Sequence, residues 1–149
     1  MINPDLSVVM PCFQQVEFLE EAVRSVLDQE SVRVELIVLD PGSTDGSREL
    51  LERLYEEYSD ALVLVFEPVD GQSDAINKGM AMARGDILCW LNSDDRFHPG
   101  TLGRVVEMLS EAKGPAWLYG HSGIIDSTGQ PLFSFISWYK KFRGRRFSR

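Results

Sequence analysis

The sequence predicts an α/β fold, a three-layer domain in which helices cover both faces of a mostly parallel sheet. Two observations lead to this prediction. Short apolar runs rich in β-branched residues alternate four times with longer segments of helical period, and this order is typical of parallel strands joined by crossover helices. The chain has 149 residues, 44% of them hydrophobic and 26% charged, which suits a single soluble domain.

The first strand–helix–strand unit is predicted between residues 6 and 40. Leu6–Pro11 (LSVVMP) is an apolar run of strand length. Val16–Gln29 follows as a helix because its apolar residues recur at helical spacing. The apolar face of that helix consists of Leu19, Val23, Val26 and Leu27. Glu35–Asp40 (ELIVLD) is then the second strand.

The next unit extends the same alternation. A Ser-Thr-Asp triplet at residues 43–45 offers N-caps for a helix that reaches about Tyr58. Ala61–Phe66 is the third strand, and Ser73–Arg84 is a helix ended by Gly85.

The last elements are shorter. Ile87–Leu91 is apolar enough to fill the middle of a sheet, and Pro99 marks the first turn of a further helix. Trp117–Tyr119 is predicted as a fifth strand, and Gly123–Phe135, centred on "DSTG", as a hairpin.

The net charge of −8 conceals an uneven distribution. The last ten residues hold no acid and six of the fifteen basic residues: Lys140, Lys141, Arg143, Arg145, Arg146 and Arg149. Residues 1–139 therefore hold nine basic residues against 23 acidic ones, a net charge of −14. Such a body repels the nucleic-acid backbone, so we expect no nucleic-acid partner, and an anionic ligand would need a metal cation.

The cysteines and histidines do not form metal-ligand patterns. Cys12 and Cys89 have neither zinc spacing nor a disulfide framework, and His98 and His121 are equally unpatterned. If the first and fourth strands are neighbours, the two cysteines are offset by about 10 Å along the strands, beyond the reach of a disulfide. We expect two reduced, buried thiols.

Unusual polar residues lie at the ends of two of the predicted strands. Asp40 ends the second strand, and Asn92, Asp94 and Asp95 follow the fourth. Since ligands of open parallel sheets bind at the carboxyl ends of the strands, these side chains predict a site there. The segment after the first strand, "PCFQQVE", contains neither G-x-G-x-x-G nor a Walker loop, so NAD-type and P-loop chemistry are not supported.

The carboxylates at this edge have specific uses. Adjacent Asp94 and Asp95 suit magnesium or manganese, with phosphate oxygens and water completing the shell. A buried Asp40 needs a donor, such as the imide N–H of uracil. The alternatives are a solvated loop for the pair and an ordinary strand-to-helix turn for "LDPGSTDGS". Residues 70–81 are as typical of a helix that merely packs on the sheet through Gly79 as of a helix that contacts a ligand.

Together these motifs resemble the nucleotide-binding half of a family 2 glycosyltransferase with the GT-A fold. The resemblance covers roughly residues 5–126, and its motifs are "LSVVMPCFQQVEFLEEAVRSVLDQ", "ELIVLDPGSTDGS", "GQSDAINKGMAMARGDILCWLNSDD" and "FHPGTL". It implies a Rossmann-like sheet, a nucleotide-sugar-binding domain at 1–126, and a hairpin remnant with a basic aromatic tail at 127–149.

The resemblance also implies roles for individual residues. Nucleotide contacts are implied for Pro11, Phe13, Asp40, Asp74, Asn77, Lys78 and Asp94. Among these, Phe13 would stack on uracil and Asp40 would contact the base, while residues 74–78 would lie near the ribose and sugar phosphates. Asp94 and Asp95 correspond to the D-x-D region, which binds the ribose and a Mn or Mg ion.

Three departures from the family pattern matter. Pro41 stands where many members have a second Asp, and Asn92 replaces the first Asp of D-x-D. Members generally extend a hundred or more residues further, where the acceptor site and the general base lie, so we nominate no catalytic base. The implied reaction is metal-dependent transfer of a sugar from a UDP- or other NDP-sugar to an acceptor hydroxyl with inversion, the acceptor being a saccharide or lipid-linked.

Two other functions stay open at this point. A sugar nucleotidyltransferase would want a Gly-rich, basic loop after the first strand, which "PCFQQVEF" does not provide. A non-catalytic module could bind a nucleotide sugar, or dock to a membrane or partner. Its tail, residues 138–149, alternates aromatic and basic residues. A solvated terminus is the first interpretation of this tail, and peripheral contact with anionic lipid is the alternative hypothesis.

The expected location is cytoplasmic. No apolar run approaches the ~20 residues of a membrane-spanning helix, and no signal-peptide pattern opens the chain. The basic tail adds the alternative of peripheral attachment at the inner face of the membrane.

Overall fold

The computed structural model describes residues 3–132, and the chain falls into two compact units, residues 1–115 and 116–149. The first unit contains a parallel four-stranded sheet in the order β3-β2-β1-β4. Its strands are β1 (Leu6–Pro11), β2 (Val34–Leu39), β3 (Leu62–Val65) and β4 (Ile87–Trp90). The predicted α/β fold with a mostly parallel sheet is thus confirmed. The predicted boundary at residue 126 stays a prediction.

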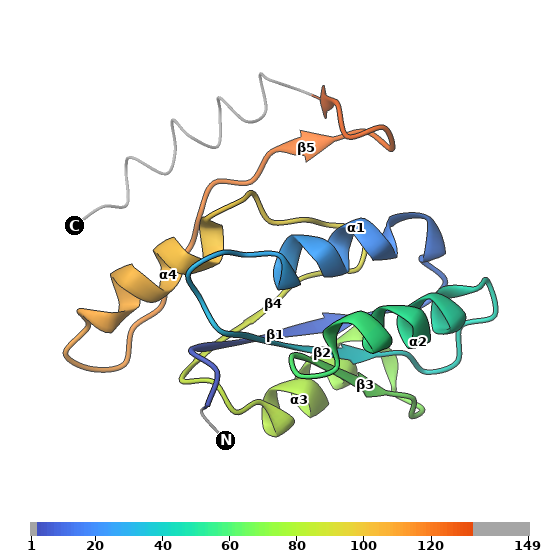
Figure 1. The fold of residues 1–149 in the computed structure, drawn as a ribbon, viewed down its shortest axis with the longest axis horizontal. Coiled ribbons are helices and arrows are strands. Elements are labelled where there is room, and N and C mark those ends of the chain that lie inside the picture. The colour runs from blue at the N-terminus through green and yellow to red at the C-terminus, as the bar shows by residue number, and fades with distance from the viewer. Residues whose placement is uncertain (1–2, 133–149) are drawn as a thin grey trace. The chain divides into compact units, whose positions relative to one another are not determined.

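Helices cover both faces of this sheet, which gives the three predicted layers (Figure 1). One face carries α1 (Val16–Leu27), α2 (Ser47–Tyr58) and α4 (Thr101–Ser110), and the other carries α3 (Gly71–Met82). Helix α1 ends two residues before Gln29, and α3 begins and ends two residues earlier than predicted. Pro99 precedes the N-cap Gly100 of α4 instead of lying in its first turn.

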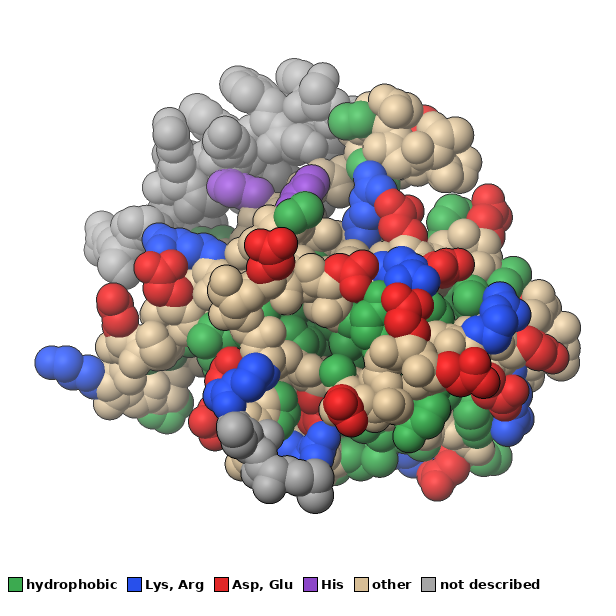
Figure 2. All heavy atoms as spheres, in the orientation of Figure 1, with side chains coloured by type: hydrophobic (Ala, Val, Ile, Leu, Met, Phe, Trp, Pro, Cys, Tyr) green, Lys and Arg blue, Asp and Glu red, His purple; other side chains and the backbone are tan. Residues whose placement is uncertain are grey.

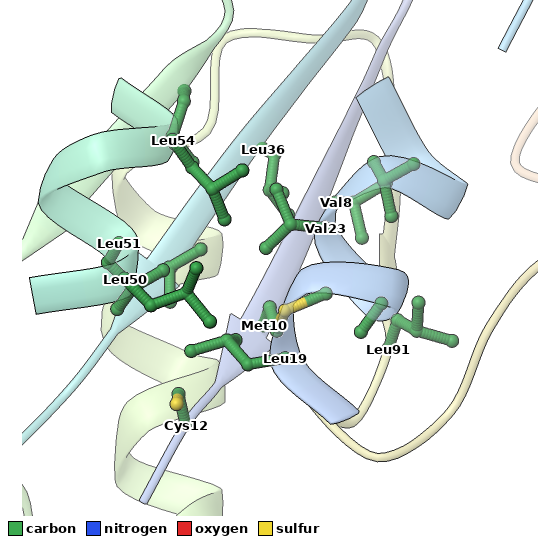
Figure 3. Close-up of a cluster of buried hydrophobic side chains, with 14 of the residues drawn as sticks. Val8, Met10, Cys12, Leu19, Val23, Leu36, Leu50, Leu51, Leu54 and Leu91 are labelled. Carbon is green, nitrogen blue, oxygen red and sulfur yellow. The ribbon is translucent and has the colours of Figure 1, made fainter. Parts of the chain in front are cut away.

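The larger part of the core lies between the sheet and helices α1 and α2 (Figure 3). Its side chains come from the apolar faces predicted from helical spacing and from alternate residues of the strands. They include Val8, Met10, Leu19, Val23, Leu36, Leu50, Leu51 and Leu54. Burial of each such side chain contributes about 1.5–3 kcal/mol, so this layer carries much of the stability of the fold.

Helix α3 packs on the opposite face unusually closely. A Cβ atom on Gly79 would lie 2.4 Å from Val9 Cγ1, closer than real contacts allow. Only glycine permits this approach, and the neighbouring contact at Ala75 is also made by a small, buried residue. The predicted packing through Gly79 is therefore present. It holds the start of α3 against the carboxyl ends of the strands.

Strand β4 lies at the edge of the described sheet, so the prediction that it fills the middle is wrong. It pairs with β1 alone among residues 3–132, with Leu6 opposite Ile87 and Val9 opposite Trp90. Ile87 and Cys89 turn toward the core, whereas Leu88 is 46% and Trp90 56% exposed. A wholly apolar run is compatible with one buried face, and composition does not reveal whether the second face is covered.

The amino-terminal end of the sheet is tied together by a buried acid. Glu35 is 2% exposed. Its carboxylate accepts hydrogen bonds from Ser7 Oγ at 2.7 Å, from the Arg84 backbone N–H at 3.0 Å and from Arg84 Nε at 2.5 Å. Ser7 Oγ in turn accepts from the Gly85 N–H at 2.9 Å. Burial raises the pKa of Glu35, but the donors from Ser7 and Arg84 outweigh it and hold the pKa below its ordinary value.

Many acidic side chains on the surface lie next to basic ones. On the face shown in Figure 2, acidic and basic side chains lie next to one another. Arg24 pairs with Glu57 at 2.9 Å, and Lys78 pairs with Asp74 at 3.3 Å. Such exposed pairs contribute little to stability, about 0–1 kcal/mol each. They do not by themselves mark a binding site.

In the described part of the second unit, the predicted hairpin forms and the predicted fifth strand does not. Strands β5 (Ile124–Ile125) and β6 (Pro131–Leu132) are antiparallel. Asp126 Oδ1 holds the turn by accepting from the N–H groups of Thr128 and Gln130, both at 2.9 Å. Residues 117–119 are not a strand, because no described segment pairs with them, and Trp117 is 87% exposed.

Two sequence predictions concern residues after 132, which the structure does not describe. The end of the predicted hairpin at Phe135 and the basic aromatic segment 138–149 lie outside the described residues. Within residues 3–132, no helix has the length and apolar character needed to cross a bilayer.

Candidate functional site

A cavity of about 670 Å³ opens at the carboxyl ends of the strands in the first unit. Three strand ends and the start of α3 build it, as expected for a parallel sheet. Its lining residues are Pro11, Cys12, Phe13 and Gln15 after β1, Leu39 and Pro41 after β2, Val69, Gly71, Gln72 and Ala75 around the start of α3, and Asn92, Ser93 and Asp94 after β4. The structure thus brings Pro11, Phe13 and Asp94 together, as the sequence predicted.

Phe13 presents an aromatic ring to this cavity. Its side chain is 57% exposed although it lies only two residues after β1, which is buried up to Met10. An exposed ring beside a hollow is available for stacking on a flat ligand, and such stacking is a common way to bind nucleobases.

Asp40 lies at the base of the site and leaves one oxygen without a partner. The residue is 1% exposed. Its Oδ1 accepts from the backbone N–H groups of Gly42 at 2.8 Å and Ser43 at 2.7 Å, but its buried Oδ2 has no hydrogen-bond partner among the described residues. Asp40 does not itself line the cavity, although Leu39 and Pro41 on either side of it do. An unpaired buried carboxylate oxygen is costly, and a ligand donor would satisfy it.

The loop after β1 is held by side chains of the 43–47 segment. The N–H groups of Gln14, Gln15 and Val16 donate respectively to Ser43 Oγ at 2.9 Å, Ser47 Oγ at 3.2 Å and Asp45 Oδ2 at 2.9 Å. The hydrogen bonds from the Val16 N–H and from Ser47 hold the pKa of Asp45 below its ordinary value. These side chains therefore hold the start of α1, while Asp45 Oδ1 also accepts the Ser47 N–H at 3.0 Å, at the first residue of α2.

The prediction that residues 43–45 supply the N-cap of the next helix is wrong as to the cap residue, which is Gly46. Helix α2 begins later, at Ser47, after Gly46 in the left-handed region at φ 100°. The same contacts bear on phosphate binding, because the N–H groups of Gln14, Gln15 and Val16, at the entry to α1, already have acceptors. These three groups are not available to a triphosphate in the way that a nucleotidyltransferase loop would require.

The predicted residues on α3 lie outside the cavity lining. Asp74 accepts from the Asp70 N–H at 3.0 Å and pairs with Lys78, whose Nζ donates to the Pro68 carbonyl at 2.9 Å. The Asp70 N–H and Lys78 hold the pKa of Asp74 below its ordinary value. Asn77 is exposed. Their assignment to the ribose and phosphates stays a prediction, while the first turn of the helix faces the cavity instead.

Gln72 is the lining residue on this turn that the sequence reasoning missed. Its Nε2 donates to Asn92 Oδ1 at 2.6 Å, and Asn92 Nδ2 donates to Asp95 Oδ2 at 3.2 Å. Asn92, which departs from the family's usual Asp, thus connects α3 to the second carboxylate of the pair. Its spacing of 20 residues from Gln72 offered no local pattern that could have revealed the contact.

Asp94 and Asp95 suit a divalent metal only with help from a ligand. Both are exposed, and the Asp95 N–H closes a turn onto the Asn92 carbonyl at 3.1 Å. Residues 3–132 contain no group of three or more His, Cys, Asp or Glu side chains arranged to hold a metal. Two carboxylates beside a cavity fit Mg²⁺ or Mn²⁺, which commonly use one or two protein carboxylates plus phosphate oxygens and water.

The thiols are unbonded, as predicted. Cys12 and Cys89 are both free, but only Cys12 is buried as expected, while Cys89 is half-buried. Val8 lies opposite Cys89, so the two cysteines are offset by four residues along neighbouring strands, about 13 Å and slightly more than predicted. Burial raises the pKa of Cys12 to about 12 and that of Cys89 to about 11, so neither is an activated nucleophile at neutral pH.

The fold is a parallel α/β sheet with helices on both faces and a cavity at the carboxyl ends of its strands. The sequence matches Glycosyl transferase family 2 over residues 7–146, and the chain belongs to this family. It is 32% identical over 127 residues to an uncharacterised glycosyltransferase of Nostoc sp., covering 85% of this chain and 39% of that protein. It is 33% identical over 135 residues to the Bacillus subtilis teichuronic acid biosynthesis glycosyltransferase TuaG, covering 90% and 53%.

Solved structures share the fold. The mannosyltransferase PcManGT from Pyrobaculum calidifontis, in complex with GDP-Man and Mn²⁺, has a TM-score of 0.66 and 28% identity, covering 74% of this chain and 33% of that one. Residues 1–349 of S. aureus TarS, in complex with UDP-GlcNAc, have a TM-score of 0.65 and 20% identity, covering 78% and 38%, a likeness of fold alone. The chain thus spans only about a third to a half of the length of these proteins.

Proposed function

We propose that this chain is the donor-binding part of a glycosyltransferase that uses a UDP- or other NDP-sugar. The observation that carries the proposal is the buried Oδ2 of Asp40, which lacks a partner beside a cavity large enough for a nucleotide. Family membership supports it, as does the likeness to PcManGT with its bound GDP-Man and Mn²⁺. Asp40 and Phe13 together suit a planar base that carries an N–H on its edge.

In this proposal the base stacks on Phe13 and donates its N–H to Asp40. Uracil offers N3–H and guanine offers N1–H, so either base satisfies a carboxylate that can only accept. Pro11 contacts the base, and the predicted positions Asp74, Asn77 and Lys78 lie toward the ribose and sugar phosphates. With Pro41 next in the chain, Asp40 is the sole acid at this place in the loop.

The diphosphate of the donor lies toward Asp94 and Asp95. These two carboxylates would hold a Mn or Mg ion together with phosphate oxygens, and the ion would stabilise the negative charge that develops on the departing diphosphate. Asn92, held by Gln72, keeps Asp95 oriented for this role. The acidic body of the protein otherwise repels such an anion.

The proposed reaction is an in-line displacement at the anomeric carbon. The acceptor hydroxyl oxygen forms the new bond to that carbon on one side while the bond to the diphosphate oxygen breaks on the other, which inverts the configuration. A base must take the hydroxyl proton, and we assign that role to no residue of this chain. The acceptor in this proposal is a saccharide or a lipid-linked molecule at the cytoplasmic face of the membrane, and a saccharide fits the name of the relative TuaG, which refers to teichuronic acid biosynthesis.

Calorimetric titration with UDP, GDP and dTDP, each with and without Mn²⁺, tests the proposal. We expect at least one diphosphate to bind in a metal-dependent manner. In the Asp40→Asn variant, Oδ1 can still accept from Gly42 and Ser43 while a donor replaces Oδ2. Its affinity for the preferred diphosphate should fall about 10- to 100-fold, the equivalent of one hydrogen bond to a charged group.

The controls separate binding from folding and from catalysis. Asp60→Ala removes an exposed acid that does not line the cavity, and it should leave the affinity unchanged. Unchanged affinity in Asp40→Asn would contradict the proposed contact between Asp40 and the nucleobase. Binding without release of diphosphate in the presence of donor sugar and candidate acceptors would favour the alternative of a non-catalytic nucleotide-sugar-binding module.

A further inference from the structure

The two loops that flank the cavity are joined through Ser43. This serine is 9% exposed. Its backbone N–H donates to Asp40 Oδ1 at 2.7 Å, and its Oγ accepts the Gln14 N–H at 2.9 Å. One residue therefore touches both the acid at the base of the site and the loop that carries Phe13.

The first of these contacts fixes the free oxygen of Asp40. With Oδ1 held by the N–H groups of Gly42 and Ser43, the carboxylate has a single rotational setting in which both bonds are kept. That setting leaves Oδ2 as the oxygen without a partner. The direction in which Asp40 can accept from a ligand is thus set by the backbone of the 42–43 turn.

The second contact fixes the loop after β1 in an unfavourable conformation. Gln14 has φ 56°, in the left-handed region that non-glycine residues rarely adopt. Such a conformation persists only where surrounding contacts determine it. Here they are the bond from the Gln14 N–H to Ser43 and two exposed side-chain contacts with Thr44, at 3.1 and 3.4 Å. Phe13 precedes Gln14, so its ring follows the loop.

We propose that Ser43 is the positioning residue that sets the ring of Phe13 relative to the free oxygen of Asp40 and thereby determines the base selectivity of the cavity. The inference rests on the proposed function. A base can stack on Phe13 and donate to Asp40 together only when ring and oxygen keep one relative placement. Stacking and metal-bound phosphate alone tolerate any base.

The removal of Oγ tests this directly. In Ser43→Ala the N–H to Asp40 remains, but the Gln14 N–H loses its acceptor and the loop can relax from φ 56°. The Ser43→Thr variant keeps a hydroxyl and serves as the rescue. Thr44→Ala is the matched control, because it removes an exposed hydroxyl that contacts the same glutamine.

The readout is a ratio of affinities, measured by calorimetry with Mn²⁺ present. The probes are UDP against 3-methyl-UDP, which lacks the N3–H, and GDP against 1-methyl-GDP. We expect the wild-type protein to favour the unmethylated member of one pair about tenfold or more. The ratio should fall below about threefold in Ser43→Ala and stay near the wild-type value in Ser43→Thr and Thr44→Ala.

The outcomes separate this inference from the proposed function. A loss of folding alone would weaken both members of a pair equally and leave the ratio unchanged, so a wild-type ratio in Ser43→Ala overturns the inference. An equal fall of the affinity ratio in Thr44→Ala also overturns the inference. If Ser43→Ala does not fold, Ser43→Cys, which keeps a weaker acceptor, must show a reduced ratio. A wild-type protein that favours neither unmethylated probe overturns the proposed base pocket itself.

Discussion

Strand β2 carries a buried carboxylate at each end, and the protein satisfies only one of them. At the amino end, Glu35 accepts from Ser7 and twice from Arg84, so that both of its oxygens are bonded. At the carboxyl end, Asp40 uses one oxygen for the turn that follows and leaves the other buried and unpaired. The two acids are similarly buried, at 2% and 1% exposure.

Under the proposed function, the difference separates an acid that serves the fold from an acid that serves a ligand. Glu35 joins β1, β2 and the segment before β4. Asp40 lies between Leu39 and Pro41, which line the cavity. A buried polar atom without a partner persists when function requires it, so changes at the first end should alter stability and changes at the second should alter binding.

The largest expected effect is at the amino end. Glu35→Ala leaves the buried Ser7 hydroxyl and the Arg84 N–H without an acceptor, and should lower the free energy of unfolding by about 3 kcal/mol. Denaturant unfolding measures this. The exposed Glu56→Ala variant should change stability by less than about 0.5 kcal/mol. Nucleotide affinity per folded molecule should not change. A loss of affinity in Glu35→Ala without a loss of stability would contradict the view that Glu35 serves the fold alone.

The next effect is at the metal-binding pair. Asp95→Ala should reduce Mn²⁺-dependent UDP affinity about 100-fold, which corresponds to about 2.7 kcal/mol, because it removes one of two carboxylates from the cation. Thermal unfolding should be unchanged or slightly improved, since the like-charge repulsion with Asp94 disappears. Calorimetry with Asp60→Ala as control measures the affinity. Equal Mn²⁺-dependent affinity in Asp95→Ala and the wild type would refute the metal assignment.

A smaller effect concerns pH. The folded pKa of Glu35 is below its ordinary value of 4.5, so its contribution to stability is fully present above that value and is lost as the pH falls through the lowered pKa. Glu35→Gln has no such charge. The stability difference between wild type and Glu35→Gln, about 1 kcal/mol at pH 7, should therefore shrink below pH 4.5. A difference that is constant from pH 7 to pH 3 would contradict the charged network.

The smallest effect is at the thiols. With a pKa of about 12, Cys12 is roughly 10⁻⁴ thiolate at pH 8 and should react slowly with a thiol reagent in the native protein. Two thiols should titrate in denaturant without reductant. In the Cys89→Ser variant, UDP with Mn²⁺ should slow the remaining reaction further, because Cys12 lines the cavity. In Cys12→Ser, where only Cys89 remains, the nucleotide should have no effect.

Much of the first unit was predictable because its information is local. Periodicity marks the strands and helices, and each helix predicted in residues 16–110 forms within a few residues of its expected bounds. The edge with the polar residues follows from parallel strands alone, which explains why Pro11, Phe13 and Asp94 meet at one cavity. Trp117–Tyr119 shows the limit of this reasoning, since three apolar residues form a strand only if another segment pairs with them.

The sequence by itself determined the α/β alternation, the family, and the edge of the sheet at which the cavity opens, because these depend on spacing along the chain. Tertiary structure alone decided which groups are satisfied. It brought Ser43, Asp45 and Ser47 onto the N–H groups at the entry to α1, and it placed Gln72 on Asn92. It also left one oxygen of Asp40 without a donor while it bonded both of Glu35. Hydrogen bonds between residues about 20–50 positions apart depend on how the loops approach in space, and no local pattern records that approach.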